Sequence, residues 1–226
     1  MDARRPKTVG HRGASALAPE NTLAAFELAI QYGLDRAELD VHLSRDGQLM
    51  VIHDADLARV ARQPTRVADL RARDLASYDV PRLEDVFELA RGRLGIYAEL
   101  KGPGTGAALG ELTRRGGATG VELISGSFQP ELVAELYAVD PSVPRSVLFA
   151  HTSTRSMVDV CRSVDATYAH PCFRPVDQHM IDALHAADLV VMTPHTNDAA
   201  EAREFARLGV DVIASDDPRV LEPVRR

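Results

Sequence analysis

A regular alternation of short strand-like runs and amphipathic helical segments continues along nearly the whole chain and restricts the fold most strongly. The strand-like runs are Thr8–His11, Ala37–Leu43, Leu49–His53, Gly95–Leu100, Val121–Ser125, Arg145–Ala150, Ala166–Ala169, Leu189–Thr193 and Val210–Ala214. The helical segments between most of them are Asn21–Tyr32, Leu83–Ala90, Gly106–Arg115, Pro130–Tyr137, Ser153–Ser163, Asp177–Ala187 and Asp198–Leu208. Alternation of this kind is typical of βαβ units, and it predicts the α/β class with a parallel sheet.

One connection is too short for this arrangement. Only residues 43–48 separate His42 from Leu49, whereas a parallel crossover needs about a dozen residues or more. The second and third runs are therefore expected to form an antiparallel hairpin. The loop contains Asp46 and Gly47, which are the preferred pair for a two-residue type I′ turn.

The hairpin has two consequences for the predicted fold. A two-residue turn sets Asp40 directly opposite His53, so that both side chains project from the same face of the sheet. With the returning strand set aside, eight parallel strands remain, which fits a TIM-type (β/α)8 barrel. Residues 55–81 break the alternation and are interpreted as a short insertion above the barrel mouth, so residues 1–226 are expected to form a single domain.

Composition excludes several classes of function. The 226 residues carry a net charge of −7 without a block of like charges, which argues against a nucleic-acid partner. No apolar run approaches the ~18 residues that span a bilayer, so no stable membrane insertion is expected. The polar start Met1–Lys7 leads directly into the first strand without a signal peptide, which predicts a cytoplasmic protein. The spacing of Cys161 and Cys172 matches no zinc or redox motif, and the sequence indicates no oligomeric state.

Three acids are candidates for a metal site. Glu38 and Asp40 are two residues apart on one predicted strand, so both side chains face the same way. Without a cation, two such carboxylates in a barrel interior repel each other, whereas Mg²⁺ or Ca²⁺ prefers oxygen ligands of this kind. Glu99, at the end of another strand, supplies a third ligand, and Lys101 beside it offers charge to a phosphate. The alternatives are an exposed strand with solvated charges and a structural Glu–Lys ion pair.

Two histidines at strand ends are candidates for acid–base chemistry. His11, followed by Arg12 and Gly13, ends the first strand, and His53, followed by Asp54, ends the third. Arginine is suited to bidentate contact with a phosphate. Together with the acids, these residues form the set that metal-assisted hydrolysis of an anionic ester requires.

Other polar residues have weaker support as site residues. His42 shares the strand face of Asp40 and is a candidate for supporting the site from behind. Glu20 and Asn21 fit either the barrel mouth or the cap of a helix. Further residues near strand ends that could line the mouth are Ser127, Phe128, His151, His170, His195 and Asp216.

These motifs resemble those of the glycerophosphodiester phosphodiesterase family. The matching segments are His11-Arg12-Gly13, Pro19-Glu20-Asn21-Thr22, Glu38-Leu39-Asp40-Val41, Asp46-Gly47, His53-Asp54, Glu99-Leu100-Lys101, Ser127-Phe128 and Ser215-Asp216-Asp217-Pro218. The resemblance implies a metal-dependent barrel enzyme of lipid and glycerol metabolism that cleaves glycerophosphodiesters to an alcohol and glycerol 3-phosphate. It also implies roles for single residues: His11 and His53 as the acid–base pair, Glu38, Asp40 and Glu99 as metal ligands, and Arg12 and Lys101 on the substrate phosphate.

The sequence departs from the family pattern near the eighth parallel strand. Pro194 stands where family members usually have a tryptophan, and His195 stands where they have a threonine. This difference concerns substrate recognition, so the head group, the metal and the first nucleophile (water or the substrate's 2-hydroxyl) are left open. Two other functions remain as alternatives: a phospholipase D-type enzyme acting on lysophospholipids or sphingolipids, and a non-catalytic protein that binds phosphate esters.

Overall fold

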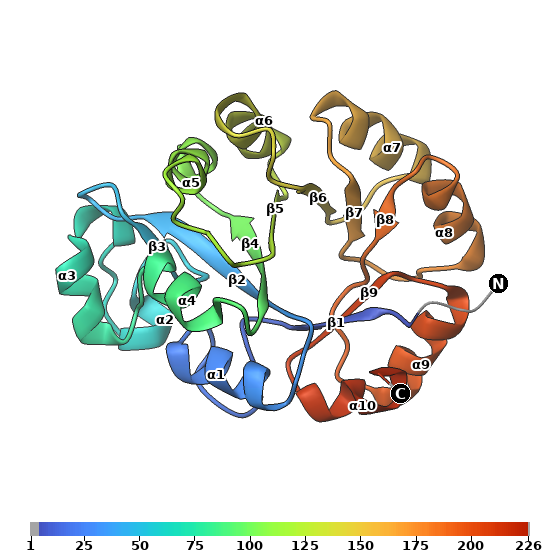
Figure 1. Cartoon of the computed structure of the whole chain (residues 1–226), viewed down its shortest axis with the longest axis horizontal. Helices are drawn as coiled ribbons and strands as arrows, with labels where there is room; N and C mark the ends of the chain where they lie inside the picture. Colours follow the sequence, from blue (N-terminus) through green and yellow to red (C-terminus); the bar gives the residue numbers. More distant parts are fainter. Residues whose placement is uncertain (1–4, 226) are drawn as a thin grey trace.

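A computed structural model describes residues 5–225 and shows a ring of eight parallel strands with helices outside it (Figure 1). The hydrogen-bonded order around the ring is β8 (Val190–Val191), β7 (Tyr168–Pro171), β6 (Arg145–Phe149), β5 (Leu123–Ser127), β4 (Gly95–Leu100), β2 (Arg36–Leu43), β1 (Lys7–Gly10) and β9 (Val212–Ser215). A bridge between Met192 and Val212 joins the two ends of this order. The predicted (β/α)8 barrel is therefore confirmed.

The helices predicted between the strands are present, with bounds within a few residues of those expected. They are α1 (Leu23–Gln31), α4 (Leu83–Ala90), α5 (Thr105–Arg114), α6 (Pro130–Val139), α7 (Thr154–Ser163), α8 (Gln178–His185) and α9 (Ala199–Leu208), and α10 (Glu222–Arg225) follows the last strand. Polar caps fix several starts: the side chains of Thr22, Ser153, Asp177 and Asp198 accept backbone N–H groups of the first turn. Within residues 5–225, no helix combines the length and apolarity that crossing a bilayer requires.

The extra strand β3 (Leu49–Val51) pairs antiparallel with β2, as predicted, but the predicted register is wrong by one residue. Val51 lies opposite Val41, and the N–H of Ile52 donates to the carbonyl oxygen of Asp40 at 2.9 Å. Ile52, and not His53, therefore stands opposite Asp40. His53 follows the end of β3, so the loop and not the strand pleat sets the direction of its side chain.

The turn chemistry explains this difference. A type I′ turn needs positive φ at both central residues, but only Gly47 (φ +76°) has it in this loop, and Asp46 does not. The Asp46 carboxylate instead accepts hydrogen bonds from Ser44 Oγ at 2.8 Å and from the backbone N–H of Ala72 at 2.9 Å. These contacts favour a three-residue loop, which shifts the pairing by one position.

The segment from residue 55 to residue 81 packs against the outside of this hairpin (Figure 1). It contains the short helices α2 (Ala58–Ala61) and α3 (Ala72–Leu75) and the 3-10 turns η1 (Val67–Asp69) and η2 (Ala76–Tyr78). Leu57, Val67 and Leu75 form a small core with Met50 and Ile52 of the hairpin. The insertion therefore holds the segment that carries His53. That the whole chain forms one domain remains a prediction.

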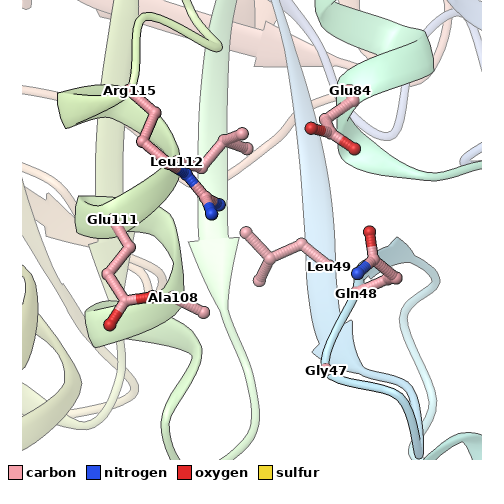
Figure 2. A pocket seen from close by; sticks show the side chains of 8 residues that line it. All are labelled: Gly47, Gln48, Leu49, Glu84, Ala108, Glu111, Leu112 and Arg115. Carbon is pink, nitrogen blue, oxygen red and sulfur yellow. The ribbon is translucent and has the colours of Figure 1, made fainter.

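The other side of the hairpin turn borders a small pocket of about 70 Å³ (Figure 2). Leu49 of the hairpin and Leu112 of α5 point into it, and Glu84 of α4 lies at its edge. None of the predicted site residues lines this pocket, so the site must be sought at the carboxyl ends of the strands.

Candidate active site

The structure brings the three predicted acids together inside the barrel. Strands β2 and β4 are neighbours, with Asp40 paired in register with Glu99, and Glu38 lies two residues before Asp40 on the same face. One carboxylate oxygen from each of the three lies within 4.8 Å of the others, and all three side chains are buried.

Hydrogen bonds from the surrounding loops satisfy only part of this cluster. Glu38 Oε2 accepts the backbone N–H of Arg12 at 2.8 Å, whereas its Oε1 is buried without a hydrogen-bond partner among the described residues. Asp40 Oδ2 accepts from Asn21 Nδ2 at 2.8 Å. Burial, and then the charge of Asp40, raise the pKa of Glu38, and the same two causes raise the pKa of Glu99. The ionised cluster is therefore unstable on its own, and its chemistry fits a hard cation.

The loop after β1 is shaped by this cluster. Arg12 has a left-handed backbone (φ +57°), which is unusual for a bulky residue and aims its N–H at Glu38. Its carbonyl oxygen accepts the N–H of Asn21, also left-handed (φ +58°), at 3.0 Å. At Gly13 (φ +83°) a Cβ would stand 2.7 Å from that of Ala25, so α1 can pack closely only against glycine.

The two predicted phosphate-binding side chains border the acids. Arg12 Nε lies 3.4 Å from Asp40 Oδ2, and Arg12 Nη1 donates to Glu20 at 2.9 Å. Lys101 Nζ donates to Glu99 Oε1 at 2.8 Å and lies 3.3 Å from Asp40 Oδ1. Burial by itself would lower the pKa of Lys101, but the charges of Glu99 and Asp40 outweigh it and raise the pKa, so the ammonium stays charged.

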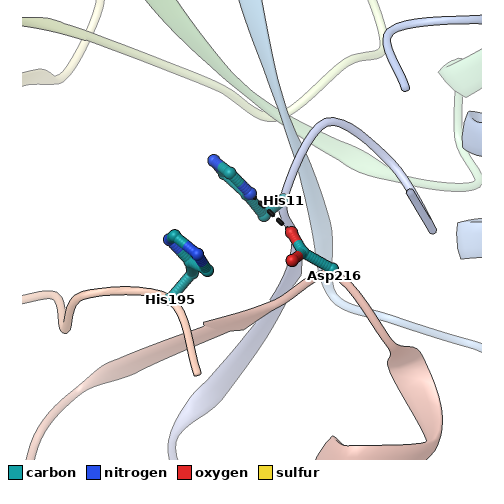
Figure 3. Close-up of side chains that lie close together, drawn as sticks. All are labelled: His11, His195 and Asp216. Carbon is teal, nitrogen blue, oxygen red and sulfur yellow. Dashed lines mark hydrogen bonds and ion pairs between the residues drawn. The ribbon is translucent and has the colours of Figure 1, made fainter. Parts of the chain in front are cut away.

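His11 is held by an aspartate from the opposite end of the chain. Its Nδ1 donates to Asp216 Oδ1 at 2.6 Å, and Asn197 Nδ2 donates to the other Asp216 oxygen at 2.6 Å. Figure 3 shows the His195 ring lying flat against that of His11, with centroids 4.3 Å apart and planes 7° apart. Burial would lower the pKa of His11, but the bond to Asp216 and the charge of Glu38 outweigh burial, so the pKa is raised.

His53 has a matching arrangement. Its Nδ1 donates to Asp54 Oδ1 at 2.6 Å, and Asp54 Oδ2 accepts from Arg59 Nε at 2.6 Å. Arg59 also donates to Glu20 at 2.8 Å, which joins this pair to the side chain of Arg12. With Nδ1 bound to a carboxylate in both histidines, Nε2 is the nitrogen available to a substrate.

A cavity of about 240 Å³ at the barrel mouth connects these groups. The predicted site residues that line it are His11, Arg12, Glu38, His53, Glu99 and Lys101. Phe128, Pro194 and His195 also line it. Of the predicted site residues only Asp40 does not line the cavity. It is 1% exposed, and Asn21, Arg12 and Lys101 contact its carboxylate.

Sequence reasoning named Asp54 and Asp216 but did not find that they orient the two histidines. The position of each aspartate after a strand end was a usable signal for a place at the barrel mouth. The pairing of His11 with Asp216 had no such signal, because the two residues lie 205 positions apart. Neither Asn197 nor the stacking of His195 had a local signal. His42 does support the site from behind, because its Nε2 donates to the carbonyl oxygen of His53 at 3.1 Å.

Comparison with known proteins decides the family. The model of the glycerophosphoryl diester phosphodiesterase family matches residues 11–220. The chain belongs to this family. A glycerophosphodiester phosphodiesterase of Bacillus altitudinis is 30% identical over 94% of this chain and 95% of its own length.

Solved structures of family members share the fold. The crystal structure of the glycerophosphodiester phosphodiesterase from Agrobacterium tumefaciens is 32% identical and matches with a TM-score of 0.81 over 95% of this chain and 98% of its own. A phosphodiesterase of Oleispira antarctica, solved in complex with the product sn-glycerol-3-phosphate, is 24% identical and matches with a TM-score of 0.87 over 98% and 97% of the two chains. The barrel of this chain is thus shared with both solved structures.

A further histidine lies beneath the cavity in the barrel interior. His170 Nε2 donates to the carbonyl oxygen of Thr193 at 2.8 Å, and its Nδ1 lies 3.4 Å from the hydroxyl of Tyr97. Burial lowers the pKa of His170 to about 4, so the imidazole is neutral in the folded protein. In the unfolded chain its pKa is near 6.5, so the unfolded state takes up a proton first as the pH falls.

The pH dependence of stability follows from this difference. The contribution of His170 is complete above about pH 6.5 and is lost as the pH falls toward 4, by about 2 kcal/mol between pH 7 and pH 5. Urea unfolding of His170→Gln should therefore lose about 2 kcal/mol less than the wild type over this interval. His179→Gln, at an exposed position on α8, should keep the wild-type slope. Equal slopes for His170→Gln and the wild type would contradict the assignment.

Proposed function

We propose that this protein is a metal-dependent phosphodiesterase that hydrolyses glycerophosphodiesters to an alcohol and glycerol 3-phosphate. One observation carries the proposal: two histidine–aspartate pairs border the same cavity as a buried cluster of three acids. Family membership and the activity named for the Bacillus altitudinis relative support it. So does the product named in the Oleispira antarctica complex.

Glu38, Asp40 and Glu99 would hold a divalent cation, with Mg²⁺ or Ca²⁺ favoured by the all-oxygen donor set. The unpartnered Oε1 of Glu38 and the raised pKa values of Glu38 and Glu99 support this assignment. A bound ion would supply Lewis-acid polarisation of a phosphoryl oxygen.

Charge balance agrees with a phosphodiester substrate. Three ionised acids with Arg12 and Lys101 leave a net charge of −1, which a divalent cation changes to +1. A phosphodiester carries one negative charge and would neutralise the site. Arg12 and Lys101 then hold the phosphate between them. Both side chains stay protonated, because the nearby acids raise their pKa values by more than burial lowers them.

The two histidines act as acid and base. Each is fixed through Nδ1 to an aspartate, which sets the tautomer and turns Nε2 toward the cavity. One histidine removes a proton from the nucleophile and the other protonates the departing alkoxide. Asp216 and Asp54 stabilise the imidazolium that forms on either side, and their partners Asn197 and Arg59 hold them in place.

Metal binding can be tested by unfolding as well as by activity. A ligand at a hundredfold excess over Kd stabilises a protein by about 2.7 kcal/mol, or about 5–10 °C in melting temperature for a chain of this size. Mg²⁺ or Ca²⁺ should raise the melting temperature of EDTA-treated wild type by this amount. Glu38→Gln should lose both this increase and activity.

The same variant has a second signature. Glu38→Gln removes a carboxylate whose ionised form is destabilised by burial and by Asp40, so the metal-free variant should melt at a higher temperature than the metal-free wild type near pH 8. Glu111→Gln, on the surface of α5, is the matched control and should change neither quantity. Full activity of Glu38→Gln in EDTA would exclude the metal proposal.

Loss of either histidine should remove most of the catalysis. General acid–base groups contribute ~10²–10⁴-fold each, so His11→Ala and His53→Ala should lower kcat by at least about a hundredfold with little change in KM. The measurement is enzyme-coupled detection of glycerol 3-phosphate with metal present, and His179→Ala serves as the control. A variant with near-normal kcat would remove that histidine from the acid–base pair.

A further inference from the structure

A second and larger cavity, of about 800 Å³, opens beside His53. It lies between the start of α1 and the insertion, so two segments far apart in the sequence form its walls. His53 lines both this cavity and the reaction cavity, which makes the two adjoining spaces. Nothing in the proposed chemistry uses this second space, which we call the outer cavity.

The reaction cavity is too small for a large diester. Its volume of about 240 Å³ lies below the ~300–1,000 Å³ of pockets that enclose drug-sized ligands, whereas the outer cavity lies within that range. The charged groups that recognise phosphate, Arg12 and Lys101, line the reaction cavity. A large substrate with its phosphate there must therefore extend elsewhere. With His53 as the acid that protonates the departing alkoxide, the alcohol extends into the space next to His53.

Most of the exposed residues that line the outer cavity are apolar, and the charged exceptions are Arg59 and Asp79. Leu23 at the start of α1 is 41% exposed and Val60 on α2 is 45% exposed. Across residues 5–225 the large hydrophobic side chains with such exposure are Leu23, Val60, Phe128 and Tyr137. Phe128 lines the reaction cavity, so all of them except Tyr137 surround the two adjoining spaces. Exposed apolar side chains gathered in this way mark a ligand-binding surface.

The acids of this cavity are mostly neutralised. Glu20 accepts from both Arg12 and Arg59, and Asp85 accepts from Arg82 on its own helix start. Asp79 is then the one acid of this lining without an ion pair among the described residues, which leaves little net charge to attract a cationic head group. The charge pattern and the exposed apolar residues together favour an occupant that has an uncharged, apolar body.

We propose that the outer cavity binds the alcohol portion of the diester and selects alcohols that carry an apolar chain. The inference rests on the proposed function and adds a substrate class to it. Leu23 and Val60 contact the chain, and His53 stands where the chain meets the phosphate.

A series of synthetic substrates tests this directly. Glycerol 3-phosphate esterified with methanol, butanol or hexanol changes the apolar area while the leaving alkoxides keep nearly equal basicity. A fully buried CH₂ contributes about 0.8 kcal/mol, which is about fourfold in affinity. We expect kcat/KM to rise at least tenfold from the methyl to the hexyl diester.

Two variants locate the effect. Leu23→Asp places an acid at the first position of α1, where the helix dipole favours it, so the variant should fold. Val60→Asp provides a second test on an independent segment. Each should reduce the ratio of hexyl to methyl kcat/KM at least threefold. Tyr137→Glu, at 42% exposure on α6 and outside both cavities, is the matched control and should keep the ratio.

The outcomes separate the inference from the proposed function. Release of glycerol 3-phosphate from no diester in the presence of Mg²⁺ or Ca²⁺ would overturn the proposed function itself. Turnover of the methyl diester without a gain for hexyl would overturn only the outer-cavity proposal. Preference for the choline or ethanolamine diester over the hexyl one would do the same and would point to Asp79, an exposed acid of this cavity. A gain from a hexanoyl chain on the glycerol instead would reverse the orientation and contradict the proposal.

Discussion

The mutual repulsion of three buried carboxylates is the interaction on which the rest of the site depends. Glu38, Asp40 and Glu99 come within 4.8 Å of one another because two neighbouring barrel strands carry them in register. A low-dielectric interior makes such repulsion costly. The surrounding groups offset this repulsion: backbone and side-chain donors point at the acids, and a lysine and an arginine lie against them. Without the three carboxylates, these donors and cations would have no acceptors at this place in the barrel.

Backbone strain is stored in the same place. Arg12 and Asn21 both adopt left-handed conformations, which cost a non-glycine residue of order 1 kcal/mol or more each. The two strained residues bond to each other, and each donates to one acid of the cluster. The sequence assignment of Asn21 to either the mouth or a helix cap is thereby resolved, since Thr22 caps α1 and Asn21 contacts Asp40. Hydrogen bonds to the acids thus hold the loop in its strained conformation.

Local patterns predicted the barrel well, and non-local contacts account for the errors. The spacing of Glu38 and Asp40 is a property of any strand, so it could be read without a structure. The hairpin register could not, because the Asp46 carboxylate accepts a hydrogen bond from Ala72, 26 residues later, and this changes the turn. The orientation of His11 could not be predicted from the sequence either, because its partner Asp216 lies 205 residues away.

The contact between His11 and Asp216 has a consequence for biosynthesis. Its two members lie 205 residues apart, on the loops that follow β1 and β9, and these first and last strands pair with each other in the barrel. During translation His11 is therefore made 205 residues before the aspartate that orients it. A chain that lacks β9 and Asp216 therefore cannot orient His11 in this way, and the hydrogen bond forms only once β9 has joined β1 in the ring. The pairing of β1 with β9 and the orientation of His11 by Asp216 therefore arise together.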